Sequence, residues 1–251
     1  MKERVWKNIA FTLSAVAFLV AVWAVAWAAV GNELLVPSFS DSVKKFFSLW
    51  VDGAFWVALC RTLLRVLSAF LCSFTFGVVL AVIAYLYPMF GRFFAPIVAV
   101  MRSTPVLAVS LILIVWAGAG TAPILVAVLS LFPILYAGTL SALFGVDNDL
   151  IEMSRAYKVS YRKQVKSLYL PAVAPYMIRE SGAGLGFAVK LVVSAEVLVR
   201  TKNSLGGAIW EAQLYTEMPL LFALVIVACL FGFLFDCLGG AVGNAVERRL
   251  Q

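Results

Sequence analysis

The sequence predicts an all-α membrane protein with about six transmembrane helices. Of its 251 residues, 63% are hydrophobic and only 13% are charged, whereas an ordinary soluble domain is about 45–50% apolar. The mean hydropathy is +0.99, and long uncharged runs alternate with short polar segments along the whole chain. Because one helical crossing of a bilayer needs about 20 apolar residues, the chain has room for about five to seven spans and for no sizeable soluble domain.

Six spans are predicted from the positions of the apolar runs. They cover residues 8–30, 66–87, 93–117, 124–144, 171–199 and 219–242. The third span is expected to break near Pro105, because proline lacks the backbone N–H that continues a helix. Residues 118–123 contain two glycines and a proline, and they predict a tight reversal before the fourth span. The chain thus divides into an N-terminal span with an extracytoplasmic segment, residues 1–60, and a core, residues 61–251, which contains a polar cytoplasmic loop at residues 147–170.

The first span has two interpretations. It follows Lys2, Arg4 and Lys7, as either a signal peptide or a signal anchor would. Its apolar stretch exceeds the roughly 7–15 residues of a cleaved signal peptide, which favours retention as a membrane span. Residues 24–26, Ala-Val-Ala, are similar to a cleavage site, so removal of this segment stays the alternative.

Lysine and arginine predict the orientation of the spans. With six spans both termini lie on one side of the membrane, and the more basic side is expected to be cytoplasmic. Eleven basic residues fall on the side of the termini and six on the other. The eleven are Lys2, Arg4, Lys7, Arg92, Arg155, Lys158, Arg162, Lys163, Lys166, Arg248 and Arg249, and the six are Lys44, Lys45, Arg61, Arg65, Arg200 and Lys202. Both termini and residues 147–166 are therefore expected in the cytoplasm, and the net charge of +7 needs no nucleic-acid partner.

Several kinds of chemistry are excluded by what the sequence lacks. It contains no histidine, so histidine triads, histidine metal sites and histidine proton relays are absent. It contains no GxxxxGK phosphate-binding loop followed by serine or threonine, so any ATP must be bound by another subunit. The four cysteines, Cys60, Cys72, Cys229 and Cys237, form no CxxC pair and are expected to be small buried hydrophobic residues. We therefore expect no catalysis, metal or cofactor in this chain.

The polar segment between the fourth and fifth spans predicts a short amphipathic helix. A helix that begins near Asp149 would place Glu152, Arg155 or Ala156, and Val159 on one face. Acidic residues at its start and basic residues at its end suit the helix dipole. Such a helix, held outside the membrane, can insert into a groove of a soluble partner. A solvated loop that serves only the positive-inside topology is the alternative.

The same segment resembles the cytoplasmic EAA loop of binding-protein-dependent ABC importer permeases, which has Glu-Ala-Ala, a glycine four residues after the second alanine, and Leu-Pro further on. Glu152, the small Ser154, Val159-Ser160 and Leu170-Pro171 match this pattern in type and spacing. Met153 replaces the first alanine, and Lys158 replaces the glycine, so a more continuous helix is expected in place of two short helices joined by a turn. The residues that the resemblance assigns to coupling are Glu152, Met153, Ser154, Arg155, Ala156, Tyr157, Lys158, Val159, Ser160, Leu170 and Pro171.

Other segments between residues 60 and 240 resemble the nitrate/sulfonate/taurine-type branch of these permeases. They are Arg61-Thr62-Leu63-Leu64-Arg65-Val66, Thr104-Pro105, Trp116-Ala117-Gly118-Ala119-Gly120, Ala195-Glu196 and Leu205-Gly206-Gly207-Ala208-Ile209-Trp210. Ala117 departs from the pattern, because members of the branch usually have phenylalanine at that position.

This resemblance implies a type I-like permease in the bacterial cytoplasmic (inner) membrane that does no covalent chemistry. It implies two identical copies, two cytoplasmic ATPase subunits that bind ATP and Mg²⁺, and an extracytoplasmic solute-binding protein. The coupling helix between spans four and five would dock on an ATPase, and the two copies would rock between inward and outward openings. A secondary transporter driven by an ion gradient is the alternative function, but the deep acidic residues and inverted repeat that it requires are not evident. A membrane enzyme or scaffold is a further alternative, and the absence of histidine and of metal-type clusters disfavours the enzyme.

Polar residues inside the predicted spans are candidates for a translocation pathway. A charged side chain at the bilayer centre costs about 2.5–3.5 kcal/mol on insertion scales, so each one needs a functional or structural reason. The candidates are Arg102, Thr104, Lys190, Ser194 and Glu196, and local packing or pairing between helices is the alternative for them. Glu196 is expected to pair with Arg200, four residues further on. Lys190 and Arg102 favour an anionic or small polar substrate.

Small residues four apart predict close packing between spans. Gly182 with Gly186 and Gly239 with Gly243 have this spacing. Gly182, Gly184 and Gly186 follow no strand, so they do not form a phosphate-binding loop. Hinge motion during transport is compatible with the same glycines.

Overall fold

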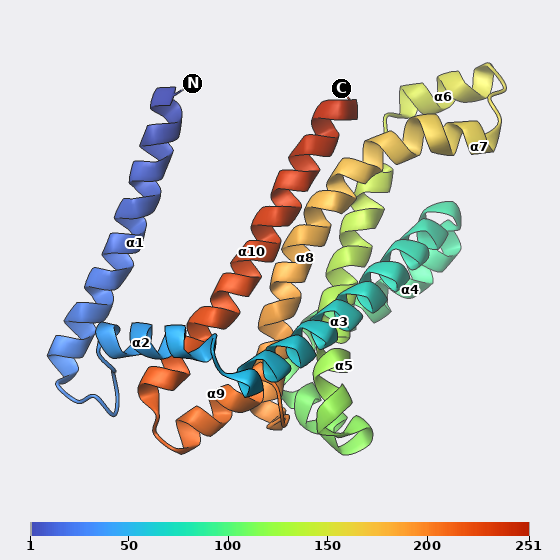
Figure 1. The fold of residues 1–251 in the computed structure, drawn as a ribbon. Helices are drawn as coiled ribbons and strands as arrows, with labels where there is room; N and C mark the ends of the chain where they lie inside the picture. Colours follow the sequence, from blue (N-terminus) through green and yellow to red (C-terminus); the bar gives the residue numbers. More distant parts are fainter. Residues whose placement is uncertain (1, 251) are drawn as a thin grey trace.

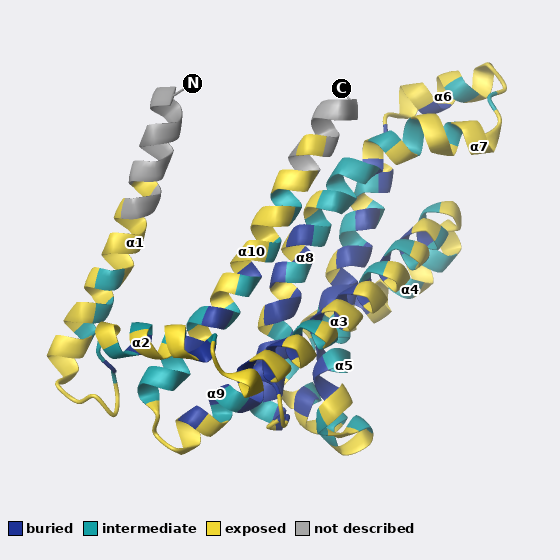
Figure 2. Cartoon of the chain, viewed as in Figure 1, coloured by how far each residue is buried: buried dark blue, intermediate teal, exposed yellow. Residues whose placement is uncertain are grey.

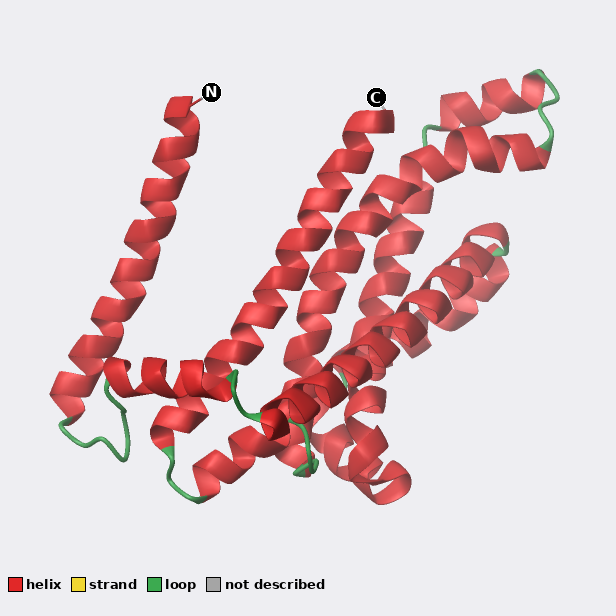
Figure 3. Cartoon of the chain, viewed as in Figure 1, coloured by secondary structure: helices red, strands yellow, loops and turns green. Residues whose placement is uncertain are grey.

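In the computed structural model the chain is described over residues 2–250, without the side chains of residues 2–10, 12, 13, 243, 244 and 246–250. Lys2, Arg4, Lys7, Arg248, Arg249 and Gly243, which entered the topology and packing predictions, thus lie outside the described side chains. The described chain is helical with short connections and contains no strand (Figure 3). Its elements are α1 (Lys2–Val30), α2 (Phe39–Leu49), α3 (Gly53–Leu86), α4 (Pro88–Ser103), α5 (Val106–Phe144), α6 (Asn148–Ala156), α7 (Tyr161–Gln164), the π-helix η1 (Val165–Tyr169), α8 (Leu170–Val199), α9 (Leu205–Leu214) and α10 (Met218–Leu250).

Four helices of the bundle are each long and apolar enough to cross a membrane. Within the described residues these are α3, α5, α10 and the continuous helical run that ends with α8, while residues 14–30 of α1 form a shorter apolar helix. In the bundle α8 packs along α10 and α5, and α5 packs along α3. Figure 1 shows α1 standing apart from the bundle, with α2 running between the lower parts of α1 and α10. Trp23 of α1 contacts Phe222 of α10 at a ring-centroid distance of 5.0 Å.

The boundaries of the second, third and fourth predicted spans differ from the structure. α3 begins at Gly53 and not at residue 66, because the Asp52 carboxylate caps it by accepting the N–H of Ala54 at 2.9 Å. The expected break near Pro105 is confirmed between α4 and α5. The reversal occurs at Gly118, whose φ of 73° and ψ of 164° interrupt α5, whereas residues 119–123 are helical. Six crossings remain a prediction, since they require α5 to contribute to two of them.

Glycines bring α8 and α10 into close contact, as the sequence predicted for Gly182 and Gly186. A β-carbon at Gly182 would overlap the backbone of Gly239, and one at Gly186 would meet the carbonyl oxygen of Gly232 at 2.7 Å. Because neither helix has side chains at these points, their backbones approach closely enough for dense van der Waals packing.

The core lies where α3, α5, α8, α9 and α10 meet, and much of the outer surface is apolar. The fully buried side chains include Leu59, Val66, Leu131, Val189 and Leu205. The outward faces of the long helices are exposed (Figure 2). All four cysteines are exposed, so the expectation of buried cysteines was wrong. In a bilayer the lipid tails are as apolar as the core, and apolar residues therefore need no burial within the protein.

Candidate functional site

The polar segment after α5 forms the helix α6 that the sequence predicted. α6 begins at Asn148, where the carboxylate of Asp147 accepts the N–H of Asp149 at 2.9 Å. The acidic Asp149 lies in its first turn and the basic Arg155 in its last, as the helix dipole favours. Ile151 points inward and is buried against residues of α5 and α8, among them Val173. This contact fixes α6 to the ends of two long helices.

Lys158 ends α6 and turns the chain into α7. Its φ of 52° lies in the left-handed region that glycine adopts most readily. The N–H of Lys158 donates to the carbonyl of Arg155 and the N–H of Val159 to that of Ser154, both at 2.9 Å. These two bonds form a Schellman motif with lysine at the usual glycine position. The expected continuous helix was therefore wrong, because the backbone makes the glycine-type turn without a glycine.

The exposed face of α6 combines apolar and charged side chains. Leu150, Met153 and Tyr157 are spaced three and four residues apart, and Met153 and Tyr157 are 53% and 79% exposed. Glu152 and Arg155 are also exposed. Val159 was wrongly assigned to this face, because it lies past the helix end and is half-buried. Leu150 was missed, although its spacing from Met153 could have identified it.

The π-helix η1 joins α7 to α8 just before the Leu170-Pro171 pair. In η1 the N–H of Leu170 donates to the carbonyl of Val165, five residues back. Proline at position 171 lacks an N–H and disfavours the regular helical pattern just before it, which explains a π-turn here. The hydroxyl groups of Tyr85 and Tyr169 lie 3.2 Å apart and attach this turn to α3. Neither tyrosine was a sequence candidate.

Glu196 lies at the centre of a buried hydrogen-bond network at the opposite end of the bundle. Its carboxylate is fully buried and accepts bonds from Arg65 Nη1 at 2.9 Å and from Thr62 Oγ1 at 2.9 Å. The same carboxylate accepts the N–H of Gly206 at 3.1 Å, and Thr62 Oγ1 accepts the N–H of Leu205 at 2.9 Å. The network thus satisfies the first N–H groups of α9 and joins that helix to α3 and α8.

Arg65 and Thr201 extend the network to the reversal at Gly118. Arg65 Nε donates to the carbonyl of Gly120 at 3.2 Å, and Thr201 Oγ1 donates to that of Ala119 at 2.8 Å. The expected Glu196–Arg200 pair was wrong in its partner. Arg200 takes a left-handed conformation after α8 and its guanidinium lies 4.7 Å from the ring centroid of Trp210. The sequence did not predict that Thr62 and Arg65 contact Glu196.

Lys190 and Ser194 line an open groove beside α8. Its volume is about 470 Å³, and its other lining residues are mainly apolar side chains such as Leu107, Ile209 and Val225. Lys190 and Ser194 belong to a stripe of exposed residues on α8, together with Ala183 and Phe187. Most other residues of α8 are buried or half-buried.

Arg102 and Thr104 lie at the break between α4 and α5. Arg102 is exposed in the last turn of α4. Thr104 and Pro105 are extended, and Thr104 Oγ1 donates to the carbonyl of Val100 at 2.7 Å. In a membrane, non-helical backbone is tolerated where it is buried in protein or lines a watery cavity. The sequence candidates thus lie in three places. Lys190 and Ser194 line the groove beside α8, Arg102 and Thr104 lie at the helix break, and Glu196 belongs to the buried hydrogen-bond network.

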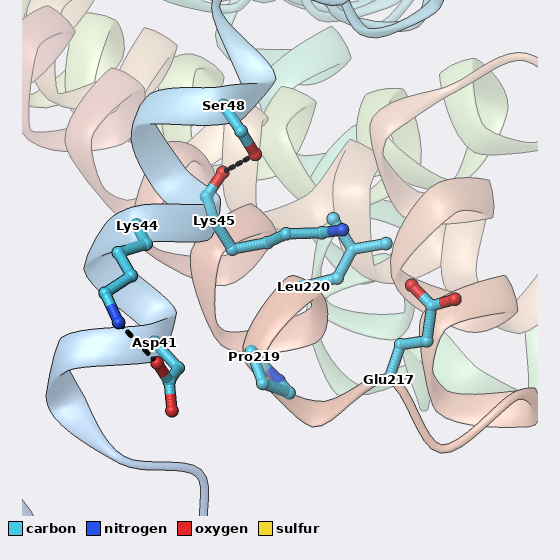
Figure 4. A pocket seen from close by; sticks show the side chains of 7 residues that line it. All are labelled: Asp41, Lys44, Lys45, Ser48, Glu217, Pro219 and Leu220. Carbon is cyan, nitrogen blue, oxygen red and sulfur yellow. Dashed lines mark hydrogen bonds and ion pairs between the residues drawn. The ribbon is translucent and has the colours of Figure 1, made fainter.

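A polar groove lies at the end of the bundle opposite α6. It lies between α2 and the start of α10, has a volume of about 470 Å³ and is drawn in Figure 4. Lys44 pairs with Asp41 at 3.1 Å, while the chain of Lys45 extends over Leu220 on the side of Glu217. The hydroxyl of Ser38 and the ammonium of Lys44 lower the pKa of the Asp41 carboxyl.

The chain is a bundle of long apolar helices with a folded polar hairpin at one end and a helix break at Thr104-Pro105, an arrangement that suits a membrane permease. Residues 73–250 match the family described as binding-protein-dependent transport system inner membrane component. The chain belongs to this family, and it is the permease subunit of an ATP-driven ABC importer.

Individual relatives agree with this assignment. The chain is 26% identical over 237 residues to the putative aliphatic sulfonates transport permease protein SsuC of Bacillus subtilis (strain 168), covering 93% of this chain and 84% of the relative. It is 24% identical to the taurine transport system permease protein TauC of Escherichia coli (strain K12), covering 97% and 90%. The predicted resemblance to the sulfonate and taurine branch is thereby confirmed.

Solved structures of importers share the fold. A chain of a bacterial alginate ABC transporter, crystallised with an alginate pentasaccharide-bound periplasmic protein, has a TM-score of 0.66 at 14% identity and covers 97% of this chain and 98% of its own length. A chain of the inward-facing MetNI methionine ABC transporter has a TM-score of 0.61 at 20% identity, with coverages of 80% and 97%.

Proposed function

We propose that two copies of this chain form a translocation pathway for a small anionic solute in the bacterial inner membrane. Two cytoplasmic ATPase subunits would bind ATP and Mg²⁺, and an extracytoplasmic solute-binding protein would deliver the solute. The chain itself would do no covalent chemistry, and both of its termini would lie in the cytoplasm. None of the relatives or solved structures described above favours the secondary-transporter alternative.

The exposed face of α6 is the observation that carries this proposal. A helix outside the membrane that exposes Leu150, Met153 and Tyr157 beside Glu152 has the composition of a surface that a protein partner covers. Its inner side is fixed by Ile151, so force applied to α6 would be transmitted to α5 and α8. An ATPase subunit that moves on ATP binding would therefore act on two helices of the bundle.

The exposed stripe on α8 supports a pathway between two copies. An ammonium group facing lipid inside a span is costly, so Lys190 would face water or another protein chain. A second copy that faces the same stripe would enclose a cavity lined by Lys190 and Ser194 from each side. The break at Thr104-Pro105 and the exposed Arg102 would supply further polar groups to this cavity.

The substrate class follows from the lining of the groove beside α8. Lys190 provides its cationic group, Ser194 a hydroxyl, and most of the remaining wall is aliphatic. Such a wall suits a small anion with an apolar body. SsuC and TauC, to which the chain is similar, are described as permeases for aliphatic sulfonates and taurine, and solutes of this kind are the first to test.

Uptake into proteoliposomes that contain the permease, its ATPase and its solute-binding protein tests this function. Taurine and a series of alkanesulfonates are suitable solutes. We expect the solute to accumulate only when ATP is present on the side of the membrane where the ATPase lies. Vanadate should abolish this accumulation, and ionophores should leave it unchanged. If the solute instead accumulates without ATP and ionophores abolish this accumulation, the protein is a secondary transporter.

A further inference from the structure

A groove between α4 and α5 has a lining that, apart from Arg102, the proposed translocation pathway does not use. Its volume is about 450 Å³, and its charged groups are Arg92 and Arg102. The lining between them includes Ala95, Ala99 and Leu140. Positions 92, 95, 99 and 102 are spaced three, four and three residues apart, so they share one face of α4. The groove is therefore an apolar channel with a guanidinium group toward each end.

The charges of this groove are all positive. No acidic residue lines it. Within the described part of the chain, neither Arg92 nor Arg102 has an ion pair or hydrogen bond. They are ten residues apart, which is about 15 Å along a helix. The groove thus lacks a counter-charge from its own chain and is complementary to an anion that also carries an apolar part.

The position of the groove indicates where this anion comes from. Arg92 lies one turn after the connection between α3 and α4, which is at the same end of the bundle as α6 and α7 (Figure 1). Phe144, the last residue of α5, lines the same groove. Since α3 and α5 are long enough to span a membrane, the groove begins near the membrane surface and runs inward along α4.

We propose that this groove binds an anionic phospholipid. The phosphate of the headgroup binds the guanidinium of Arg92, and an acyl chain lies along Ala95, Ala99 and Leu140. Basic pockets between membrane helices on the cytoplasmic side bind anionic headgroups in this way, and arginine suits phosphate because it donates several hydrogen bonds in one plane. The small alanine side chains leave room for the acyl chain. Arg102 marks the inner end of the groove, beside the helix break.

Lipid titration of the purified chain tests the headgroup contact. The delipidated permease is mixed with phosphatidylglycerol or phosphatidylcholine of identical acyl chains, and bound lipids are counted by native mass spectrometry. We expect tighter binding of phosphatidylglycerol and about fivefold weaker binding of it in Arg92→Gln, the equivalent of about 1 kcal/mol for one basic residue near a membrane surface. Lys163→Gln removes an exposed charge at the same end of the molecule but outside the groove, and should bind as the wild type does.

A second variant tests the acyl-chain contact with both arginines kept. Ala95 is exposed, so Ala95→Trp should fold normally while it fills the groove, and we expect it to lose the preference for phosphatidylglycerol. Equal binding of the two lipids by the wild type, or equal losses in Arg92→Gln and Lys163→Gln, would overturn the proposal. So would full competition by soluble glycerol 3-phosphate, or a change of Ala95→Trp from dimer to monomer without a change in lipid binding, which would assign the groove to a second copy.

Discussion

The guanidinium of Arg65 and the carboxylate of Glu196 lie 2.9 Å apart, although 131 residues separate them in the sequence. The side chain of Glu196 is fully buried, whereas that of Arg65 is 15% exposed. Through Thr62 and Gly206 the same carboxylate also holds the start of α9. The pair therefore joins three helices at the end of the bundle opposite α6.

Replacement of Glu196 by glutamine is expected to destabilise the permease strongly. The amide has no charge to offset that of Arg65, and it brings an NH₂ group against the N–H donors that the carboxylate satisfies. Removal of one partner of a buried ion pair costs about 3–5 kcal/mol, which corresponds to about 6–20 °C in the unfolding midpoint of a chain of this size. Thermal unfolding of the purified protein in mild detergent measures it.

Arg200→Gln is the matched control for this prediction. Arg200 is exposed and contacts the ring of Trp210, so its loss should lower the midpoint by only a few degrees. If Arg200→Gln destabilises the protein as much as Glu196→Gln does, the pairing of Glu196 with Arg65 is not the main contribution of that carboxylate.

Lys158→Gly is expected to stabilise the turn between α6 and α7. The left-handed backbone conformation of Lys158 costs roughly 1–2 kcal/mol of conformational free energy, whereas glycine adopts this conformation freely. Hydrogen exchange of the amides at residues 158 and 159 reports the opening of this turn, and we expect it to slow by about tenfold. Lys158→Ala removes the same charge but keeps a β-carbon, so it should not slow exchange. Equal slowing in both variants would attribute the effect to the charge.

The sequence predicted the features that composition and local spacing control. The long apolar runs predicted the spans, and the acidic start and basic end of residues 148–156 predicted α6. It did not predict the partner of Glu196, because Arg65 lies far away in sequence and only packing of α3 on α8 brings it near. The late start predicted for the second span had a similar cause, since Arg61 and Arg65 interrupt the apolar run while the helix continues through them. The left-handed lysine was missed because residue preference is weaker than the hydrogen bonds of the turn.

Lys45→Glu is expected to weaken stimulation of the ATPase by the solute-binding protein. Lys45 and Glu217 lie in the polar groove at the end of the bundle opposite α6, where an extracytoplasmic partner would bind. Reversal of one charge at such an interface mainly slows association, so we expect a several-fold higher concentration of binding protein at half-maximal stimulation. Lys202→Glu changes an exposed lysine outside this groove and should leave that concentration unchanged.

Lys190→Gln is expected to weaken transport of anionic solutes. A hydrogen bond to a charged group contributes about 1.5–3 kcal/mol, so the KM for uptake of an alkanesulfonate should rise by roughly 10- to 100-fold. Lys190→Arg keeps the positive charge and should retain most of the affinity. An unchanged KM in Lys190→Gln would remove this residue from the pathway.

The proposed function depends on the contact between α6 and an ATPase subunit, and co-purification with Met153→Asp measures this contact. Met153 is an exposed apolar residue of α6, and aspartate would place a charge in the proposed interface. Met89→Asp is the control, because Met89 is also exposed, at the start of α4 at the same end of the bundle. The tagged chains are purified from membranes in mild detergent, and the ATPase recovered per permease is measured by quantitative mass spectrometry. We predict near-complete loss of the ATPase from Met153→Asp and wild-type recovery with Met89→Asp. Equal recovery of the ATPase with wild type, Met153→Asp and Met89→Asp would show that α6 does not bind it.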